Sequence, residues 1–244
     1  MMNDNYYSYL NLMSKTGIYP DKGNFNFYLN YLFGDVEFAN KSMLDIGGGS
    51  GLFTLFGGAM GIRKGVCLEP EASGSKTEES KLFNDYSRQL GLSNVKLVTD
   101  TLQEFIYTVK FDIILLHYSI NHLDEKACIN LLTNQWARNA YEKIFQRLDD
   151  LAAPNAHLII VDCSRYNIFP AIGMKNPYAP HIVWRKHQTP EVWAEMLSSH
   201  NFIDPNIRWS SPNTLRNFGR VFLGNRVVAY LTYGTFSLRM QHTA

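Results

Sequence analysis

The sequence predicts an α/β fold in which helices cover both faces of a mostly parallel sheet. Short apolar stretches alternate with helix-compatible segments along residues 40–163. This order is typical of parallel strands joined by crossover helices. The strands are almost continuously apolar, which indicates that both faces of the sheet are buried. A three-layer α/β/α sandwich accounts for both observations.

The first expected strand ends at Asp45 and leads into a turn with Gly47, Gly49 and Gly51. Glycine lacks a Cβ atom, so the backbone can turn sharply there and approach a ligand closely. The first N–H groups of the next helix, expected over 52–60, lack partners and can bind that ligand. A nucleotide-like ligand at the carboxyl edge of the sheet is therefore expected. A dinucleotide fold would need a glycine at Leu52, so the spacing disfavours an NAD-dependent oxidoreductase.

Four further strands of this sheet are expected at 65–69, 95–99, 111–116 and 157–162. Glu69 ends the second strand, about 20 residues beyond the glycines, where a carboxylate can bind ribose hydroxyls. Asp100 follows the third strand, either in a ligand site or as the N-cap of the turn after it. His117 and Tyr118 follow the fourth strand. A long helix is expected over about 125–151. Its buried stripe is Trp136, Ala140, Ile144 and Leu148.

Residues 164–188 form an irregular insert that is rich in proline and aromatic residues. It follows a strand, so it emerges at the carboxyl edge of the sheet, and we expect it to form the main wall of a substrate pocket. Thr189 and Pro190 then begin a helix as cap and first residue. The last two strands are expected at 202–209 and 227–233, joined without a helix.

Residues 1–39 are rich in aromatic side chains and are expected to form a helical cap or lid. Tyr28, Tyr31 and Leu32 have helical spacing. Tyr6 and Tyr7 precede this regular pattern, so they are the expected lid residues.

Asp45 with Gly47-x-Gly49-x-Gly51 resembles the first motif of class I S-adenosylmethionine-dependent methyltransferases. The Phe111-Asp112 pair resembles the start of that family's fourth strand. The resemblance covers roughly residues 40–240, so 40–244 is expected to be one such domain with an insert at about 164–188. It implies seven strands, the last of which is antiparallel.

The resemblance also implies a cofactor, S-adenosylmethionine, and the product S-adenosylhomocysteine. The glycine turn would lie along the methionine part of the cofactor, and Asp45 would contact its amino group. Glu69 would bind the ribose. Asp100 and Thr101 would flank the adenine, and His117 would lie beside the methionyl group.

The expected reaction is in-line transfer of a methyl group to an oxygen or nitrogen of a small molecule, for which positioning can supply most of the catalysis. His122 and His187 are the candidate bases; either could instead be a packing residue. His122 is slightly favoured, because the fold fixes its place after the fourth strand, whereas the place of His187 depends on the insert. The candidate substrate residues are Tyr7, Tyr118, Tyr166, Trp184 and Arg216. Asp162 and Asn167 loosely resemble metal ligands of catechol-type relatives. His117 and Tyr118 replace the acid those enzymes carry after the fourth strand, so no metal is expected.

Composition narrows the function further. The formal net charge is +1, so no large electrostatic footprint for DNA is expected. The alternatives are a methyltransferase acting on RNA or protein and a non-catalytic cofactor-binding partner protein. The sequence contains three scattered cysteines, no secretory signal and no long apolar stretch. We therefore expect a cytoplasmic protein without a membrane partner, and the oligomeric state stays open.

Overall fold

A computed structural model describes residues 4–70 and 76–243 of the chain. The strands form a seven-stranded sheet, whose order is β3 (Val95–Val98), β2 (Lys64–Leu68), β1 (Ser42–Ile46), β4 (Phe111–His117), β5 (Ala152–Cys163), β7 (Thr235–His242) and β6 (Phe202–Trp209). β7 is antiparallel to both of its neighbours, whereas the pairs among β1 to β4 are parallel. The expected α/β fold with an antiparallel last strand is thus confirmed. The chain divides into two compact units, one of residues 1–116 and 151–156 and one of residues 117–150 and 157–244.

The sheet of the first unit contains the strands expected from the sequence. They are β1 (Ser42–Ile46), β2 (Lys64–Leu68), β3 (Val95–Val98) and β4 (Phe111–His117), whose last residue belongs to the second unit. Every residue of β1 is buried, as a central parallel strand requires. Asp45 pairs with Cys67 on β2, whose side chain is buried in the core.

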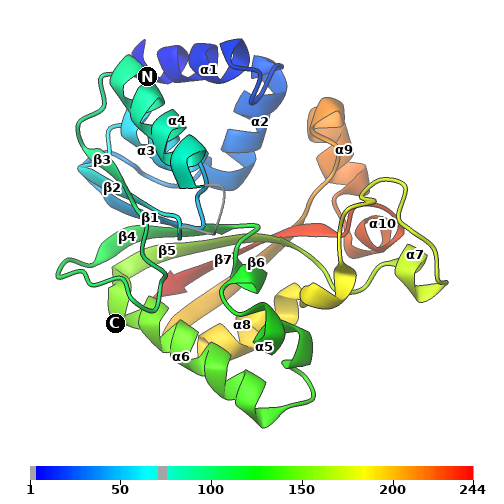
Figure 1. Cartoon of the computed structure of the whole chain (residues 1–244). Coiled ribbons are helices and arrows are strands. Elements are labelled where there is room, and N and C mark those ends of the chain that lie inside the picture. Colours follow the sequence, from blue (N-terminus) through cyan, green and yellow to red (C-terminus); the bar gives the residue numbers. More distant parts are fainter. Residues whose placement is uncertain (1–3, 71–75, 244) are drawn as a thin grey trace. The chain divides into compact units, whose positions relative to one another are not determined.

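The helices of the first unit are α1 (Asp4–Lys15), α2 (Lys22–Phe33), α3 (Leu52–Ala59) and α4 (Lys76–Gln89). Figure 1 shows α1 beside α2 and α3, on which it packs. The buried Tyr9 donates a hydrogen bond of 2.9 Å to the Leu52 carbonyl, at the start of α3. Tyr6 and Tyr7 lie within α1, a helix that precedes the one with Tyr28 and Tyr31. Tyr6 is buried, and its ring packs edge-on against Phe56.

The expected long helix after β4 is two helices. A short turn, η1 (Ile120–His122), precedes α5 (Glu125–Asn130), and α6 (Gln135–Leu151) follows after a break. The Asp124 side chain caps α5 by accepting from the Ala127 N–H at 2.9 Å. Trp136 is exposed, contrary to expectation, because the helix restarts at Gln135 and turns Ala137 and Tyr141 inward with Ile144 and Leu148.

β5 (Ala152–Cys163) begins in the first unit and continues in the second. The insert after it is mostly irregular, as expected, with only α7 (Ile168–Ala171) and η2 (Trp184–Lys186). α8 (Pro190–Ser198) begins with the expected Thr189 cap and is followed by β6 (Phe202–Trp209). The remaining elements are η3 (Asn213–Leu215), α9 (Arg216–Leu223), α10 (Arg226–Leu231) and β7 (Thr235–His242).

The expected last strand at 227–233 was wrong, and so was its direct connection to β6. Asn225 caps α10 by accepting from the Val228 N–H at 3.0 Å, so this apolar stretch is helical. The strand lies further along, where Leu238 pairs with Ile160 of β5 and with Ile207 of β6. Across the described residues, no helix is long and apolar enough to cross a bilayer.

Candidate functional site

The glycine turn after β1 has the backbone that its sequence predicts. Gly47, Gly49 and Gly51 have φ values of 68°, 55° and 78°, in the left-handed region that favours glycine. Gly51 is also the N-cap of α3, and a Cβ atom there would lie 2.3 Å from the ring of Phe83. These glycines are therefore required by the fold itself, whatever the turn binds.

Asp45 lies buried directly beneath this turn. Its Oδ2 accepts a hydrogen bond of 2.9 Å from the Thr54 hydroxyl on α3. Its Oδ1 is buried and has no hydrogen-bond partner among the described residues. Burial raises the pKa of the Asp45 carboxyl to about 7, and the Thr54 hydrogen bonds oppose this shift. An unsatisfied buried acceptor of this kind is costly unless a donor, such as an ammonium group, completes it.

Glu69, directly after β2, is tied to the same turn. Its Oε2 accepts a hydrogen bond of 2.8 Å from the Gly49 N–H. Partial burial raises the pKa of the Glu69 carboxyl; the Gly49 hydrogen bond lowers it, and nearby Glu79 raises it further. Glu79, on α4, lies 3.4 Å from where a Cβ of Gly49 would be. Sequence reasoning missed Glu79 because nothing in the spacing of α4 points to the turn.

Asp100 and Thr101 follow β3 on the surface of the first unit, and Asp100 is exposed. The hydroxyl of Thr101 accepts from the Glu104 N–H at 3.2 Å and donates to the Glu104 carboxylate at 2.7 Å. Thr101 therefore caps the short turn that follows, the role that the sequence had suggested for Asp100.

His117 is the last residue of β4 and Tyr118 follows it, at the start of the second unit. Desolvation lowers the pKa of His117 to about 3, so its imidazole is neutral at physiological pH. Tyr118 has φ of 54°, a costly conformation for a bulky residue, and its N–H donates to the Val161 carbonyl at 2.8 Å. Its ring packs edge-on against His117, with centroids 4.7 Å apart. Such strain is often retained at functional sites.

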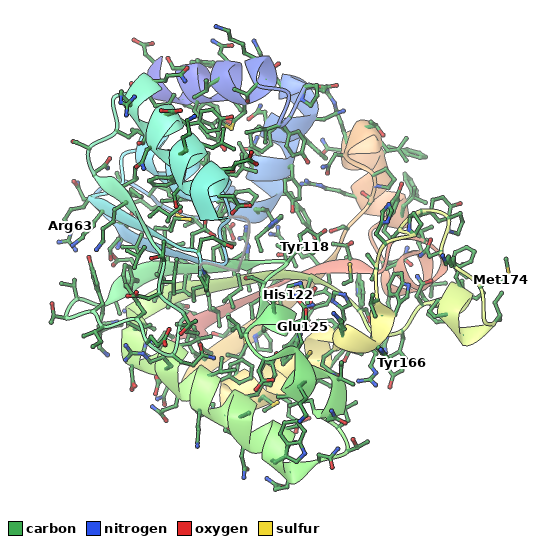
Figure 2. The ribbon with its side chains drawn as sticks, viewed as in Figure 1. Arg63, Tyr118, His122, Glu125, Tyr166 and Met174 are labelled. Atoms are coloured by element: carbon green, nitrogen blue, oxygen red, sulfur yellow. The ribbon has the colours of Figure 1, made fainter. Side chains whose placement is uncertain are left out.

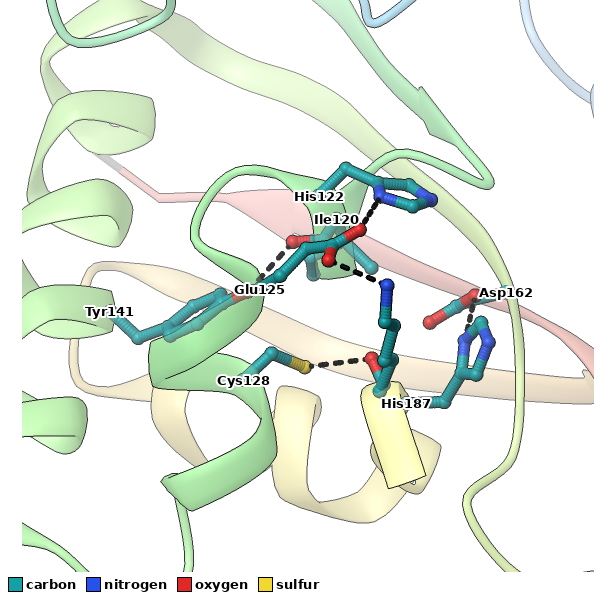
Figure 3. Close-up of polar contacts among 8 residues, drawn as sticks. Ile120, His122, Glu125, Cys128, Tyr141, Asp162 and His187 are labelled. Atoms are coloured by element: carbon teal, nitrogen blue, oxygen red, sulfur yellow. Dashed lines mark hydrogen bonds and ion pairs between the residues drawn. The ribbon is translucent and has the colours of Figure 1, made fainter. Parts of the chain in front are cut away.

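His122 belongs to an exposed chain of charged groups. Its Nδ1 lies 2.7 Å from Glu125 Oε1, and the other Glu125 oxygen lies 2.7 Å from Lys186 Nζ. Figure 2 labels His122 and Glu125 beyond the end of β4, and Figure 3 shows their contact. The His122 side chain is 57% exposed. Its contacts are those of a surface residue that links η1 and α5 to the insert.

His187 has a different setting at the end of the insert. Its Nδ1 lies 2.9 Å from Oδ1 of Asp162 on β5, as Figure 3 shows. The His187 side chain is only 12% exposed, and Asp162 is fully buried. Burial raises the pKa of Asp162, whereas the contact with His187 lowers it. An imidazole held by a buried carboxylate at Nδ1 has its tautomer and ring orientation fixed, with Nε2 left for other chemistry.

The backbone around His187 is held by its neighbours. The Gln188 side chain donates to the Cys128 carbonyl, and the Cys128 thiol donates to the Lys186 carbonyl. The His187 N–H bonds to the Trp184 carbonyl at 3.1 Å. The His187–Asp162 pair therefore rests on a buried junction between α5 and the insert.

The candidate substrate residues occupy different settings. Tyr7 is exposed on α1, and Tyr118 and Tyr166 are exposed in the second unit. Trp184 is buried, with its ring against the backbone of Gly234, so it is a packing residue in this structure. Arg216 is exposed as the first residue of α9, where its φ of 45° is strained.

The second unit contains a cavity of about 330 Å³ at the ends of β5 and β6. We call it the β5–α10 cavity. It is lined by Ser164, Tyr166, Trp209, Arg226, Val227 and Tyr230. Of the residues expected to bind substrate, only Tyr166 lines it. The α10 residues were missed because their apolar pattern was interpreted as a strand.

The two candidate metal ligands have other roles here. Asp162 binds His187, and Asn167 caps α7 by accepting from the Phe169 N–H at 3.2 Å. Within residues 4–70 and 76–243, no three His, Cys, Asp or Glu side chains are grouped closely enough to hold a metal ion.

Comparison with known proteins identifies the fold but not the family. No protein-family model and no curated protein sequence matches the chain. The solved structures that resemble it include a SAM-dependent methyltransferase from Aquifex aeolicus, with 15% identity, a TM-score of 0.54 and coverage of 88% of this chain and 93% of that one. The pyocyanin biosynthetic protein PhzM has 21% identity and a TM-score of 0.54. That alignment covers 98% of this chain and 62% of PhzM.

The N-methyltransferase NodS from Bradyrhizobium japonicum, solved with S-adenosyl-L-homocysteine, has 11% identity and a TM-score of 0.53. The alignment covers 91% of this chain and 86% of NodS. The chain therefore has the class I methyltransferase fold.

Proposed function

We propose that this protein is an S-adenosylmethionine-dependent methyltransferase that acts on a small molecule. The observation that carries the proposal is the buried, unpartnered Oδ1 of Asp45 beneath three glycines with positive φ. A carboxylate with one satisfied and one unsatisfied oxygen suits the ammonium group of the cofactor's methionine part. Bound S-adenosylhomocysteine in NodS supports the choice of cofactor.

The residues of the first unit fit this cofactor in further respects. Glu69 carries a carboxylate at the end of β2, already aligned by its hydrogen bond to Gly49, and would bind the ribose hydroxyls. Asp100 and Thr101, after β3, would flank the adenine. When bound, the cofactor would supply an activated methyl group, so the protein needs no covalent intermediate. Its main tasks are to orient the acceptor and to exclude water.

We assign the proton transfer to His187. Because Asp162 holds Nδ1 at 2.9 Å, Nε2 can accept a proton from an acceptor hydroxyl or amine. The buried carboxylate then stabilises the imidazolium that forms. The sequence alone favoured His122 slightly, but the exposed contacts of that residue suit a structural role. Neutral His117 would lie beside the methionyl group without bringing a second positive charge to the sulfonium.

Two observations support a small-molecule acceptor. The neighbours include PhzM, named for pyocyanin biosynthesis, and an N-methyltransferase, NodS. The β5–α10 cavity, at about 330 Å³, has the volume of a small-ligand pocket. An acceptor on RNA or protein and a non-catalytic cofactor-binding role are the alternatives, and both predict cofactor binding without methylation of a small molecule.

The test joins ligand binding to turnover. S-adenosylhomocysteine should raise the thermal midpoint, because a ligand that binds only the folded state stabilises it, and NAD should not. Once an acceptor substrate has been identified, His187→Ala should lower kcat by about 100-fold or more and leave S-adenosylhomocysteine affinity unchanged. His122→Ala is the matched control and should keep its turnover.

Loss of turnover in His122→Ala, with normal turnover in His187→Ala, would instead make His122 the base. A shift with NAD but none with S-adenosylhomocysteine would refute the methyltransferase. Cofactor binding without methylation of any extracted small molecule would favour the two alternatives.

A further inference from the structure

The β5–α10 cavity points to a class of acceptor. We propose that it binds a planar aromatic carboxylate of one or two rings, with Arg226 as the partner of the carboxylate. This inference rests on the proposed methyltransferase function for its biological meaning. Its physical basis is the lining of the cavity and the charge of the segments that form it.

Half of the six lining residues are aromatic. Tyr166 comes from the insert, Trp209 from the end of β6, and Tyr230 from α10. Rings from three separate elements give a rigid apolar surface, on which another ring gains stacking or edge contacts beyond the area it buries. Val227 adds an aliphatic wall. The cavity volume, near the lower end for ligand pockets, suits one or two fused rings rather than a nucleotide or a peptide.

Arg226 is the only charged residue in the lining of the described cavity. Its guanidinium lies 3.5 Å from Glu191 on α8, and both side chains are largely exposed. An exposed pair of this kind is worth little, so a ligand carboxylate can replace Glu191 at small cost. A guanidinium can bind a planar carboxylate through two parallel hydrogen bonds, which an ammonium group cannot do.

The segments that form the cavity share this preference for anions. Residues 164–190 contain Arg165, Lys175, Arg185 and Lys186 and no acidic residue. Residues 205–244 contain Arg208, Arg216, Arg220, Arg226 and Arg239 and again no acidic residue. The net charge of +1 for the whole chain conceals this asymmetry. An excess of positive charge along the segments that line a cavity favours anionic ligands over cationic ones.

Ser164, another lining residue, can orient a second substituent of the ligand. Ser164 is buried, and its position is fixed because its N–H donates to the Gly234 carbonyl at 2.7 Å. Ser164 also lies two residues beyond Asp162, the partner of His187. A ring that bears a carboxylate and a hydroxyl therefore has complementary groups in one unit of the protein.

The test is calorimetric titration of the full-length protein with para-hydroxybenzoate and hydroxynaphthoate. The matched probes are the corresponding neutral amides and cyclohexanecarboxylate, an acid without an aromatic ring. The aromatic acids should bind most tightly. Arg226→Gln should weaken acid binding about tenfold and leave amide binding unchanged, since only the charged contact is lost.

Two variants complete the design. Glu191→Gln releases Arg226 and should tighten acid binding by up to about fivefold, the range for an exposed ion pair. Arg88→Gln removes a similarly exposed arginine, 3.4 Å from Asp85 on α4 of the first unit, and should have no effect. If binding of the acids depended only on the overall charge of the protein, Arg226→Gln and Arg88→Gln would weaken it equally.

Equal binding of acids and amides would overturn the proposal, and so would binding that ignores Arg226. S-adenosylhomocysteine is titrated in the same preparations to separate the two ideas. Its binding without any aromatic acid would refute the acceptor class and leave the methyltransferase intact. Binding of the acids without S-adenosylhomocysteine would refute the methyltransferase and leave a site for aromatic acids.

Discussion

Replacing Asp45 with asparagine should change cofactor affinity and stability in opposite directions. In the absence of ligand, the buried carboxyl has a pKa of about 7, above its ordinary value of 3.8. A group whose pKa is raised by folding stabilises the protein fully below the unfolded value, and this stability is lost as the pH rises through the folded value. The difference between the two pKa values corresponds to at most about 4 kcal/mol in the free energy of unfolding. This contribution is lost progressively between pH 3.8 and about 7.

The asparagine side chain would carry no charge at any pH. The Asp45→Asn protein without ligand should therefore equal or exceed the wild type in stability above neutral pH, by up to a few kcal/mol. Urea unfolding at several pH values measures this. The Thr54 hydroxyl can still bond to the amide oxygen, so the packing beneath the turn should be preserved.

Cofactor binding should follow the reverse pattern, because an ammonium group requires the ionised carboxylate. The affinity of the wild type for S-adenosylhomocysteine should rise about tenfold per pH unit below pH 7 and level off above it. Asp45→Asn should bind weakly and with little dependence on pH in this range. Calorimetry from about pH 5 to pH 9 would refute the reasoning if the wild-type affinity were flat, or if the asparagine variant bound equally well.

Three further outcomes are expected. Gly51→Ala should destabilise the protein by about 1–3 kcal/mol in urea unfolding, because the new Cβ would overlap the Phe83 ring at an unfavourable φ. Phe83→Leu should relieve part of this loss. An unchanged urea midpoint in Gly51→Ala would contradict the packing. Glu69→Ala should weaken S-adenosylhomocysteine binding by about 1.5–3 kcal/mol, with Glu79→Ala as the neighbouring control; unchanged calorimetric affinity would mean that the ribose binds elsewhere. Turnover should survive EDTA, whereas loss of activity that magnesium restores would make Asp162 a metal ligand.

The glycine turn and the strands of the first unit could be predicted from the pattern of neighbouring residues. The glycine turn, the acid that precedes it and the strand bounds near residues 42–46, 64–68 and 111–117 agree with expectation. Each depends on neighbouring residues: continuous apolar runs form buried parallel strands, and glycines adopt positive φ. The Thr189 cap with Pro190 was predictable for the same reason.

Elsewhere, the local pattern admitted two structures. The stretch Arg226–Leu231 contains β-branched and aromatic residues that suit a strand, yet its Asn225 cap makes it a helix. Strand propensity depends on the neighbours that a segment finds, and here the sheet pairs with Thr235–His242 instead. Because this stretch was interpreted as a strand, its residues were not predicted to line the β5–α10 cavity.

By itself, the sequence determined the glycine turn, the position of the acids beside it and the alternation of strands and helices in the first half of the chain, because these are set by residues close together in the chain. Only the tertiary structure decided which histidine has a buried partner, since His187 and Asp162 are separated by the whole insert and meet through packing. It also decided that Arg226 joins Tyr166 and Trp209 around one cavity. Such meetings depend on how distant segments bury their apolar surfaces, which no local spacing records.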